Sequence, residues 1–449
     1  MTALAFLSAR ELVAGYRARD FSPVEVVGAL ATRIAELDPV LGAFTTLSLE
    51  RARLEAREAE RAYAADGAAG SLAGVPFAVK DLFDTAGVRT TYGSPMFAEH
   101  VPTRDAAAVR RARDAGAILV GKAQTHEFAW GVTSVNRLMG TSRNPWALER
   151  ISGGSIRVPS AFCGTVGLKP TYGRVSAAGA WPLARSLDHP GPMARTPSDA
   201  ALLFEALAGV DPDDPSTEDA ALGDLERELH GGLQGLRIAT CPDLHLVPLA
   251  PDLQAVFDQT LRSVEACGAQ LVEVPFPEAG LVYPTFVAVQ RAEALFTHTK
   301  AGLFPARRDE YGEDVRGRLE AAQTVGLDEY LGASADRQRI RAGFARLFRE
   351  ADLLLSPVGA GPPVPIGEDR AVHLGRELEF RELVMTYTVP QNLAGLPACA
   401  VRAGFDSLGI PVGVQLTGPP WSEARVLRAT QALFDAMPET QDRWPELPR

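Results

Sequence analysis

The feature that most constrains the fold is an alternation of short apolar runs with helical stretches. The strand-like runs "VPFAVKD" and "AILVGK" are separated by the helical stretch "RDAAAVRRARDAG". Further along, "LRIATC", "APDLQAVFDQTLRSVEACG" and "AQLVEVPFP" predict a strand, a helix and a strand, with proline and glycine at the boundaries. Because strands that are joined through a helix usually lie in one sheet, the pattern predicts an α/β fold.

The N-terminal part is expected to be helical. In "FSPVEVVGALATRIAELDP", Ser22 can cap a helix, Pro23 suits the first helical position and Glu25 completes a Ser-x-x-Glu capping box. A second helix is predicted in "LERARLEAREAERAYAADG", where Arg and Glu are spaced for mutual support and Gly67 marks the stop. We expect this charged helix to lie on the outside of the fold.

Composition narrows the class of protein. With 449 residues, of which 46% are hydrophobic, the chain can bury a large core without metals or disulfides. A net charge of −11 with scattered basic residues argues against a nucleic-acid or anionic-membrane partner. No stretch reaches the roughly 18 apolar residues of a membrane span, and the start lacks a secretory signal pattern. We therefore expect a cytoplasmic protein.

The cysteines and the short catalytic motifs give little support to other chemistries. The four cysteines lie far apart and without histidines at ligand spacing, so no metal, cofactor or disulfide is expected. "GAILVGKA" has P-loop spacing, but Ala123 stands where Ser or Thr must hold Mg²⁺, and His126 begins an incomplete H-E-x-x-H motif. Ser186, Asp188 and His189 are too close in sequence for a catalytic triad, whose members normally meet through the fold.

Two other residues allow both a structural and a catalytic interpretation. Lys80 follows the apolar run "GVPFAV"; burial would lower its pKa and make it a usable base, whereas pairing with Asp81 at the surface would make it structural. Ser155 ends the sequence "SGGS", which is either an ordinary turn or a place where backbone N–H groups approach a ligand.

A series of ordered motifs resembles the amidase signature family. They are "LAGVPFAVKDLFDTAGVRTTYGS", "GKAQTHEFAWGVTS", "RNPW", "GGSIRVPSAFCGTVGLKPTYGRVS", "SLDHPGPMARTPSDAALL" and "NLAGLPACAV" with "GIPVGVQLTGPP". The similarity covers nearly the whole chain and is least diagnostic over residues 225–350. It implies one α/β/α domain around a large twisted mixed sheet over residues 1–449, with N-terminal helices in 1–70, a catalytic core in 74–210 and a C-terminal part in 223–449.

The resemblance also implies a mechanism and a set of site residues. The family hydrolyses amide bonds through a Ser, cis-Ser, Lys triad and an acyl-enzyme, releasing an acid and ammonia or an amine. By matching motif, Ser155 takes the position of the nucleophile and Lys80 that of the lysine. The backbone N–H groups of Ser152, Gly153 and Gly154 are then expected to form the oxyanion hole. The expected substrate is a small carboxamide.

The sequence departs from the family at the cis-Ser. The family carries two Gly/Ser-rich segments, the first with the bridging serine and the second with the nucleophile, separated by a helix and a strand. This chain has one "SGGS", whose left flank resembles the approach to the first segment and whose right flank resembles the exit from the second. We expect that about 20 residues or more, one core helix and one strand, are missing. Ser152, Ser134 or a water are candidate substitutes for the bridge.

Three functions follow from this comparison of motifs. The first is an amidase acting on a small carboxamide, with its activity in question because the bridging serine is absent. The second is the glutaminase subunit of a tRNA-dependent amidotransferase, which "MTYTVPQNLAGLPA" resembles. The third is an inactive amidase-like binding or scaffold protein. A homodimer is the expected assembly at the family level.

Overall fold

The strands form two separate main sheets in the computed structural model, which describes residues 2–65, 67 and 70–447. The three-stranded sheet has the order β1 (Phe44–Leu47), β3 (Ile118–Ala123), β2 (Pro76–Lys80). The seven-stranded mixed sheet has the order β11 (Gln270–Glu273), β10 (Arg237–Thr240), β12 (Leu353–Pro357), β16 (Pro411–Thr417), β15 (Ala398–Phe405), β8 (Val166–Lys169), β9 (Met193–Ala194). The prediction of a mixed α/β fold around a large mixed sheet is confirmed.

Three two-stranded ribbons complete the β-structure. They are β4 (Val135–Asn136) with β5 (Gly140–Thr141), β6 (Arg143–Asn144) with β7 (Ala147–Ile151), and β13 (Arg370–His373) with β14 (Arg376–Glu379). The ribbon of β6 and β7 lies immediately before the "SGGS" sequence and so leads the chain into the candidate site.

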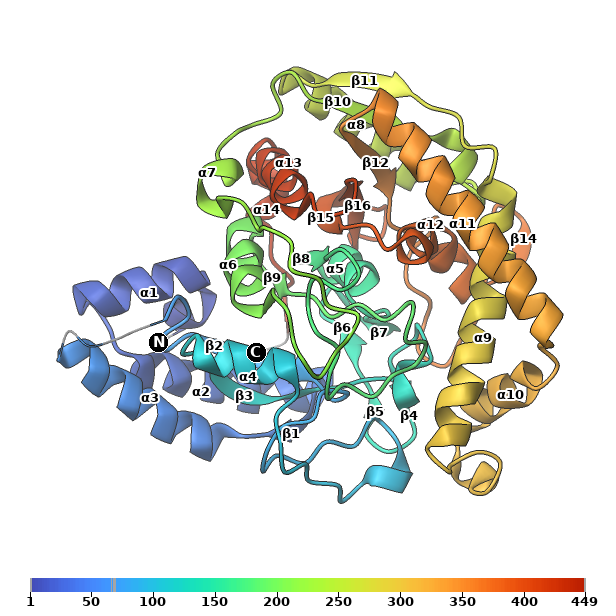
Figure 1. The fold of residues 1–449 in the computed structure, drawn as a ribbon. Coiled ribbons are helices and arrows are strands. Elements are labelled where there is room, and N and C mark those ends of the chain that lie inside the picture. Colours follow the sequence, from blue (N-terminus) through green and yellow to red (C-terminus); the bar gives the residue numbers. More distant parts are fainter. Residues whose placement is uncertain (1, 66, 68–69, 448–449) are drawn as a thin grey trace.

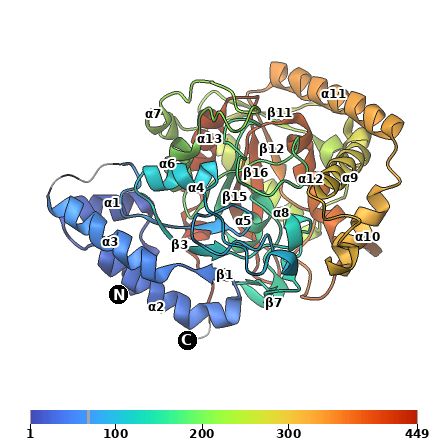
Figure 2. The same cartoon turned by 60° about the horizontal axis from the view of Figure 1, so that its bottom comes forward.

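The helices surround these sheets. They are α1 (Ala9–Ala18), α2 (Pro23–Leu41), α3 (Leu49–Ala64), α4 (Ala107–Asp114), α5 (Arg157–Cys163), α6 (Pro197–Leu207), α7 (Leu225–Leu229), α8 (Pro251–Ala266), α9 (Val282–Lys300), α10 (Glu313–Ala322), α11 (Leu327–Glu350), α12 (Phe380–Ala394), α13 (Glu423–Asp435) and α14 (Pro438–Gln441). Figures 1 and 2 show α1–α3, in blue, on one side of the molecule and α9–α11, in yellow to orange, on the opposite side. No helix within the described ranges has the length and apolar character that a membrane crossing requires.

Helix α2 begins as its sequence predicts. The Ser22 hydroxyl accepts a hydrogen bond from the Glu25 N–H, and the Glu25 carboxylate accepts one from the Ser22 N–H, which completes the capping box. Val26 and Val27 are buried on the inner face of α2. The helix ends at Gly42, whose φ of 58° is the left-handed conformation that favours glycine.

The core of the large sheet is covered on both faces. Every residue of β16 is buried, and a strand buried along its whole length cannot have a solvent-facing side. Helices α5, α8 and α13 pack against β15 and β16. The predicted strand-helix-strand unit is confirmed, because β10 and β11 pair in parallel and α8 connects them.

The two main sheets do not join. In the described part of the chain, β2 pairs with β3 alone, while β9, a strand of two residues, ends the seven-stranded sheet. The large mixed sheet that the resemblance implied is present, and strands β1–β3 form a separate smaller sheet. This separation leaves β2, which ends in Lys80, with one unpaired edge.

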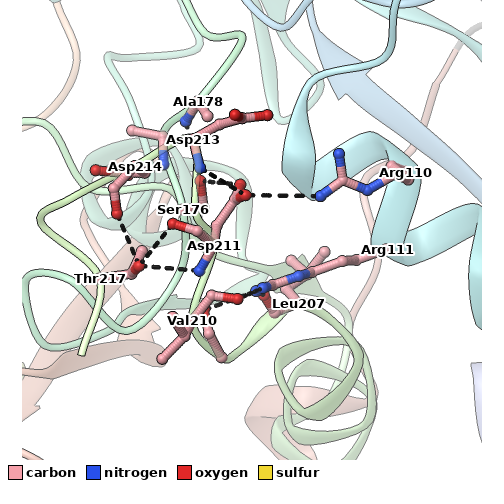
Figure 3. Close-up of polar contacts among 12 residues, drawn as sticks. Arg110, Arg111, Ser176, Ala178, Leu207, Val210, Asp211, Asp213, Asp214 and Thr217 are labelled. Carbon is pink, nitrogen blue, oxygen red and sulfur yellow. Dashed lines mark hydrogen bonds and ion pairs between the residues drawn. The ribbon is translucent and has the colours of Figure 1, made fainter. Parts of the chain in front are cut away.

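The connection that follows α6 is fixed by a polar network (Figure 3). The buried Asp211 carboxylate accepts a hydrogen bond from the Ser176 hydroxyl at 2.7 Å and pairs with Arg110 of α4 at 3.8 Å. Thr217 accepts a hydrogen bond from the Asp211 N–H at 2.9 Å, and Arg111 donates to three backbone carbonyls at the end of α6 and just beyond it. The network ties this connection to α4, beside the three-stranded sheet.

Candidate active site

Lys80 is the last residue of strand β2. Its backbone is opposite Ala123 in the parallel pairing of β2 with β3, so the strand fixes where the side chain starts. Burial lowers the pKa of Lys80 to about 8, and the nearby Asp188 carboxylate opposes this effect. An amine with this pKa is partly neutral near neutral pH and can accept a proton. Of the two interpretations of Lys80, the surface pair with Asp81 is not what the structure shows: Asp81 is fully buried and accepts hydrogen bonds from Thr91.

The loop Ser152–Ser155 connects β7 to α5. Ile151, at the end of β7, is fully buried and its N–H donates to the Val364 carbonyl, which anchors the start of the loop. Gly153 has a φ of 101°, and a Cβ there would lie 3.2 Å from Phe162 and Val158. Only glycine suits both this conformation and this close approach. The loop therefore presents Ser155, which is exposed, just before the helix begins.

The structure brings Lys80 and Ser155 together across 75 positions of sequence. The Lys80 Nζ donates a hydrogen bond to the Ser155 Oγ at 3.2 Å. This is the distance at which a base can take a proton from a nucleophilic hydroxyl. The contact is direct, from one side chain to the other.

The backbone of the loop offers hydrogen-bond donors. Within the described residues, no hydrogen bond uses the N–H groups of Gly153, Gly154 or Ser155, or that of Ser152. All four residues line the same cavity. Unpaired N–H groups beside a nucleophile are the donors that an oxyanion hole requires, so the predicted role of this loop is chemically available.

The two serines considered as substitutes for the bridge contact each other instead. Ser134 Oγ and Ser152 Oγ lie 2.9 Å apart, and the Ser134 hydroxyl donates to the Gly153 carbonyl at 2.7 Å. Ser152 also donates to the Ser142 hydroxyl at 3.3 Å. In the described part of the chain, neither Ser134 nor Ser152 hydrogen-bonds to Lys80 or Ser155. The geometry gives these hydroxyls a role in holding the loop.

Asp188 is the acidic residue whose charge acts on Lys80. Its carboxylate accepts hydrogen bonds from the backbone N–H groups of Leu183 and Ala184, at 2.8 and 3.1 Å. Burial raises the pKa of Asp188 to about 7, and the neighbouring Glu293 acts in the same direction. The sequence pattern singled out Asp188 only as a member of an implausible local triad and gave no sign of its relation to Lys80.

The short motifs that we set aside have structural roles. Ser186 bonds to Glu293, Asp188 to the backbone and the His189 ring to the Leu187 carbonyl, so the three do not form a triad. The lysine of the P-loop-like stretch, Lys122, is buried and donates to Thr85 and Thr90. His126 pairs with Asp314. The described residues contain no cluster of His, Cys, Asp and Glu that could hold a metal ion.

A buried arginine fixes the helix that follows the nucleophile. Arg157, two residues after Ser155, donates four hydrogen bonds to neutral oxygens of α12 and β16. The acceptors lie on Gln391, Gln415, Thr388 and Asn392. Burial lowers the pKa of Arg157 to about 9. The signal in the sequence that points to this residue is a charged side chain just inside an otherwise apolar helix.

One cavity of about 1150 Å³ contains the site. It is larger than most ligand pockets, which measure roughly 300–1,000 Å³. Its wall includes Lys80, Ser155 and Asp188 together with apolar residues from both sides of the separation between the sheets. These are, among others, Phe77, Ala108, Val158, Val175, Leu203 and Leu207. The cavity thus extends from the serine and lysine into the space between the three-stranded and the seven-stranded sheet.

A family model matches the chain in two segments. The model described as "Amidase" matches residues 25–155 and 152–427. The two matched segments share residues 152–155, which are the "SGGS" of the loop. Together they cover most of the chain.

Relatives and solved structures give the same assignment. A glutamyl-tRNA(Gln) amidotransferase subunit from Geobacter metallireducens is 34% identical over 477 residues, covering 96% of this chain and 97% of the relative. The alignment has 477 positions, which is more than the 449 residues of this chain. At some of these positions the relative therefore has a residue where this chain has none.

Among solved structures, an inhibitor-bound vestigial protein complex linked to an s-triazine catabolic enzyme is 30% identical, with a TM-score of 0.90 over 96% of this chain and 98% of that one. The peptide amidase of Stenotrophomonas maltophilia is 27% identical, with a TM-score of 0.83 over 99% of both chains. The chain therefore belongs to the amidase signature family, whose members are amide hydrolases and amidotransferases.

Proposed function

We propose that this protein hydrolyses a carboxamide with Ser155 as the nucleophile and Lys80 as its base in direct contact. The observation that carries the proposal is the hydrogen bond of 3.2 Å from Lys80 Nζ to Ser155 Oγ at the wall of the cavity. A serine hydroxyl can act as the nucleophile of acyl transfer and a lysine amine as its base. Serine-lysine pairs without a bridging group form a known class of catalytic site.

The reaction has two halves. A neutral Lys80 takes the proton of Ser155 as Oγ attacks the amide carbonyl, and the N–H groups of Ser152–Ser155 stabilise the oxyanion. The Lys80 ammonium then gives its proton to the leaving nitrogen, which departs as ammonia or an amine and leaves an acyl-enzyme. Water attacks the acyl-enzyme with Lys80 again as base, releasing the acid and restoring the serine.

We also propose that this chain lacks the bridging serine and the segment that carries it. Three observations support it: residues 152–155 belong to both matched segments, the aligned relative has residues that this chain lacks, and the cavity extends between the two main sheets. A direct pair must abstract the proton without a relay, so we expect turnover to be slower than in a member with the complete triad.

A second candidate is the glutaminase subunit of an amidotransferase. The relative at 34% identity is a subunit of such an enzyme, and its name includes a tRNA, which conflicts with our expectation that no nucleic acid is involved. Both candidates begin with the same step, the release of ammonia from a carboxamide. They differ in whether the chain acts alone.

Ammonia release tests the proposal. The purified chain should release ammonia from simple carboxamides, and Ser155→Ala should abolish this, while Ser71→Ala at an exposed position should not. Activity on glutamine that appears only after the other subunits of an amidotransferase are added would favour the second candidate. A folded chain that releases no ammonia from any amide, alone or with those subunits, would favour the inactive scaffold.

A further inference from the structure

One edge of strand β2 is exposed inside the cavity that contains Ser155. Within the described residues, β2 pairs with β3 alone. Ala78, in the middle of the strand, is exposed and lines the cavity, whereas the other residues of β2 are half-buried. An open strand edge presents a row of backbone donors and acceptors with which a second extended chain can pair.

The pairing of β2 determines which of its backbone groups face this edge. The Val75 carbonyl accepts a hydrogen bond from β3, and the Asp81 N–H donates one to β3, both at 2.8 Å. Successive residues of a strand direct their backbone groups to opposite sides, so the odd-numbered residues bond toward β3. The N–H and carbonyl of Ala78 and the N–H of Lys80 therefore point to the unpaired side. In the described part of the chain, these three groups have no hydrogen-bond partner.

The open edge ends at the catalytic pair. Lys80 is the last residue of β2 and donates to the Ser155 Oγ at 3.2 Å. Beyond Lys80 the chain already has a neighbour, because the Trp181 N–H donates to the Leu82 carbonyl at 2.9 Å. A chain added along β2 thus has to stop beside Lys80, where its last carbonyl meets the nucleophile.

Part of the cavity wall is apolar. It includes residues of α4, α5 and α6, namely Ala108, Val109, Val158, Leu203 and Leu207. A second cavity of about 330 Å³ borders Phe77, Ala78 and apolar residues of α2. A hydrocarbon chain would suit these walls, but it would leave the backbone groups of Ala78 without partners in an apolar space, which is unfavourable. An extended peptide with apolar side chains suits both the walls and the edge.

We propose that the unpaired edge of β2 binds the main chain of the substrate as an added parallel strand, and that the substrate is a short extended peptide with a C-terminal carboxamide. The inference rests on the proposed function and names its substrate class. The peptide runs parallel to β2, because its C-terminal amide has to lie at Lys80, the C-terminal end of the strand. Since β2 has five residues, a peptide of about three to five residues covers the edge. Hydrolysis releases ammonia and leaves the peptide acid.

Methylation of the peptide backbone tests the pairing. In a parallel pair, alternate residues of the added strand donate to β2, so an N-methyl group blocks the pairing only at every second residue. The substrate is an acetylated tetrapeptide amide of alanine and valine, compared with its forms methylated at the second or at the third nitrogen. At one of these two positions the methyl group should lower kcat/KM for ammonia release by about tenfold or more, and at the other by less than about twofold. Equal losses at both positions, or no loss at either, would overturn the pairing.

Substitutions of Ala78 test the protein side of the pairing. Ala78→Pro removes the N–H that faces the edge and no bond to β3, and proline is tolerated on an edge strand. It should raise KM for the tetrapeptide amide by about tenfold. Ala78→Val adds similar bulk and keeps the N–H, so it should raise KM by less than about threefold. Melting temperatures near that of the wild type show that both variants fold. Equal effects of the two substitutions would overturn the role of the Ala78 N–H.

A binding measurement separates this inference from the proposed function. Ser155→Ala cannot form an acyl-enzyme, so it should bind an N-terminally fluorescent form of the tetrapeptide amide without consuming it. The Kd from fluorescence anisotropy should rise about tenfold on adding Ala78→Pro and on methylating the sensitive nitrogen. Binding with this pattern, but no ammonia release by the wild-type chain, would overturn the nucleophile and leave the edge site standing.

Two other outcomes would overturn the edge site alone. The first is ammonia release from simple carboxamides by a chain that binds no peptide amide. The second concerns decanamide, an aliphatic amide of comparable length without backbone donors or acceptors. We expect its kcat/KM to be below that of the tetrapeptide amide, and a higher value would show that the cavity takes a hydrocarbon chain instead.

Discussion

The Asp188 carboxylate and the Lys80 amine both lie at the wall of one cavity, and each shifts the pKa of the other. Asp188 raises the pKa of Lys80 against the lowering effect of burial, and Lys80 lowers that of Asp188. The backbone places them together, because the Trp181 N–H donates to the Leu82 carbonyl and so holds the segment before Asp188 beside the end of β2. Glu293, from α9, also acts on Asp188 and raises its pKa.

This relationship predicts that Asp188→Asn shifts the pH dependence of the rate at which Ser155 is modified. The base must be neutral, so the rate of Ser155 modification should rise with pH around a midpoint near 8. Asp188→Asn removes the charge that stabilises the Lys80 ammonium, which lowers the pKa of Lys80 and moves the midpoint to lower pH. Asp84→Asn, at another cavity-lining aspartate, is the control and should not move it. A midpoint that moves upward in Asp188→Asn would contradict this relation.

Ser134 and Ser152 should prove to be supports of the loop. Removing the Ser134 hydroxyl breaks the hydrogen bond to the Gly153 carbonyl, and removing the Ser152 hydroxyl breaks its contact with Ser134. Each change should cost about 1 kcal/mol in the free energy of unfolding and slow Ser155 labelling by less than about tenfold. Ser134→Ala and Ser152→Ala, compared with Ser71→Ala at an exposed position, provide the measurement by chemical denaturation and labelling rate. A loss of about 100-fold or more in a stable variant would instead identify a proton relay.

Arg157 should be a large contributor to stability. Arg157→Met removes four hydrogen bonds, three of which are buried, so we expect a loss of at least about 3 kcal/mol in the free energy of unfolding. Urea unfolding measures this loss. Arg53→Met, at an exposed position of α3, should change the free energy by less than about 0.5 kcal/mol. Equal effects of the two substitutions would show that the buried network contributes little.

The local sequence predicted individual elements better than their assembly. The Ser22 capping box and the β10-α8-β11 unit follow from short-range patterns and are present. The meeting of Lys80 with Ser155 came from the family resemblance, because nothing in the residues around either one specifies a partner 75 positions away. The separation of the two sheets depends on which strands find neighbours, and pairing between distant strands has no local signal in the sequence.

The proposed loss of a segment at Ser152–Ser155 predicts that restoring the segment joins the sheets. Replacing Ser152–Ser155 by the corresponding longer segment of the Geobacter metallireducens relative should give β2 a second neighbour, fill the cavity and raise the melting temperature by several degrees. Ser155 labelling should become at least about tenfold faster. A glycine-serine insertion of equal length is the control and should give neither gain. If both insertions behave alike, the space between the sheets does not correspond to that segment.

The central claim is that Ser155 and Lys80 work as a direct pair, and mass spectrometry of the labelled chain tests it most directly. A fluorophosphonate probe should add one phosphonyl group at Ser155 in the wild-type chain, give no adduct in Ser155→Ala and react at least about 100-fold more slowly in Lys80→Ala. Lys300→Ala, at an exposed lysine, should react like the wild type. Labelling at Ser155 that is unchanged in a folded Lys80→Ala variant, or no labelling of the wild-type chain, would contradict the account.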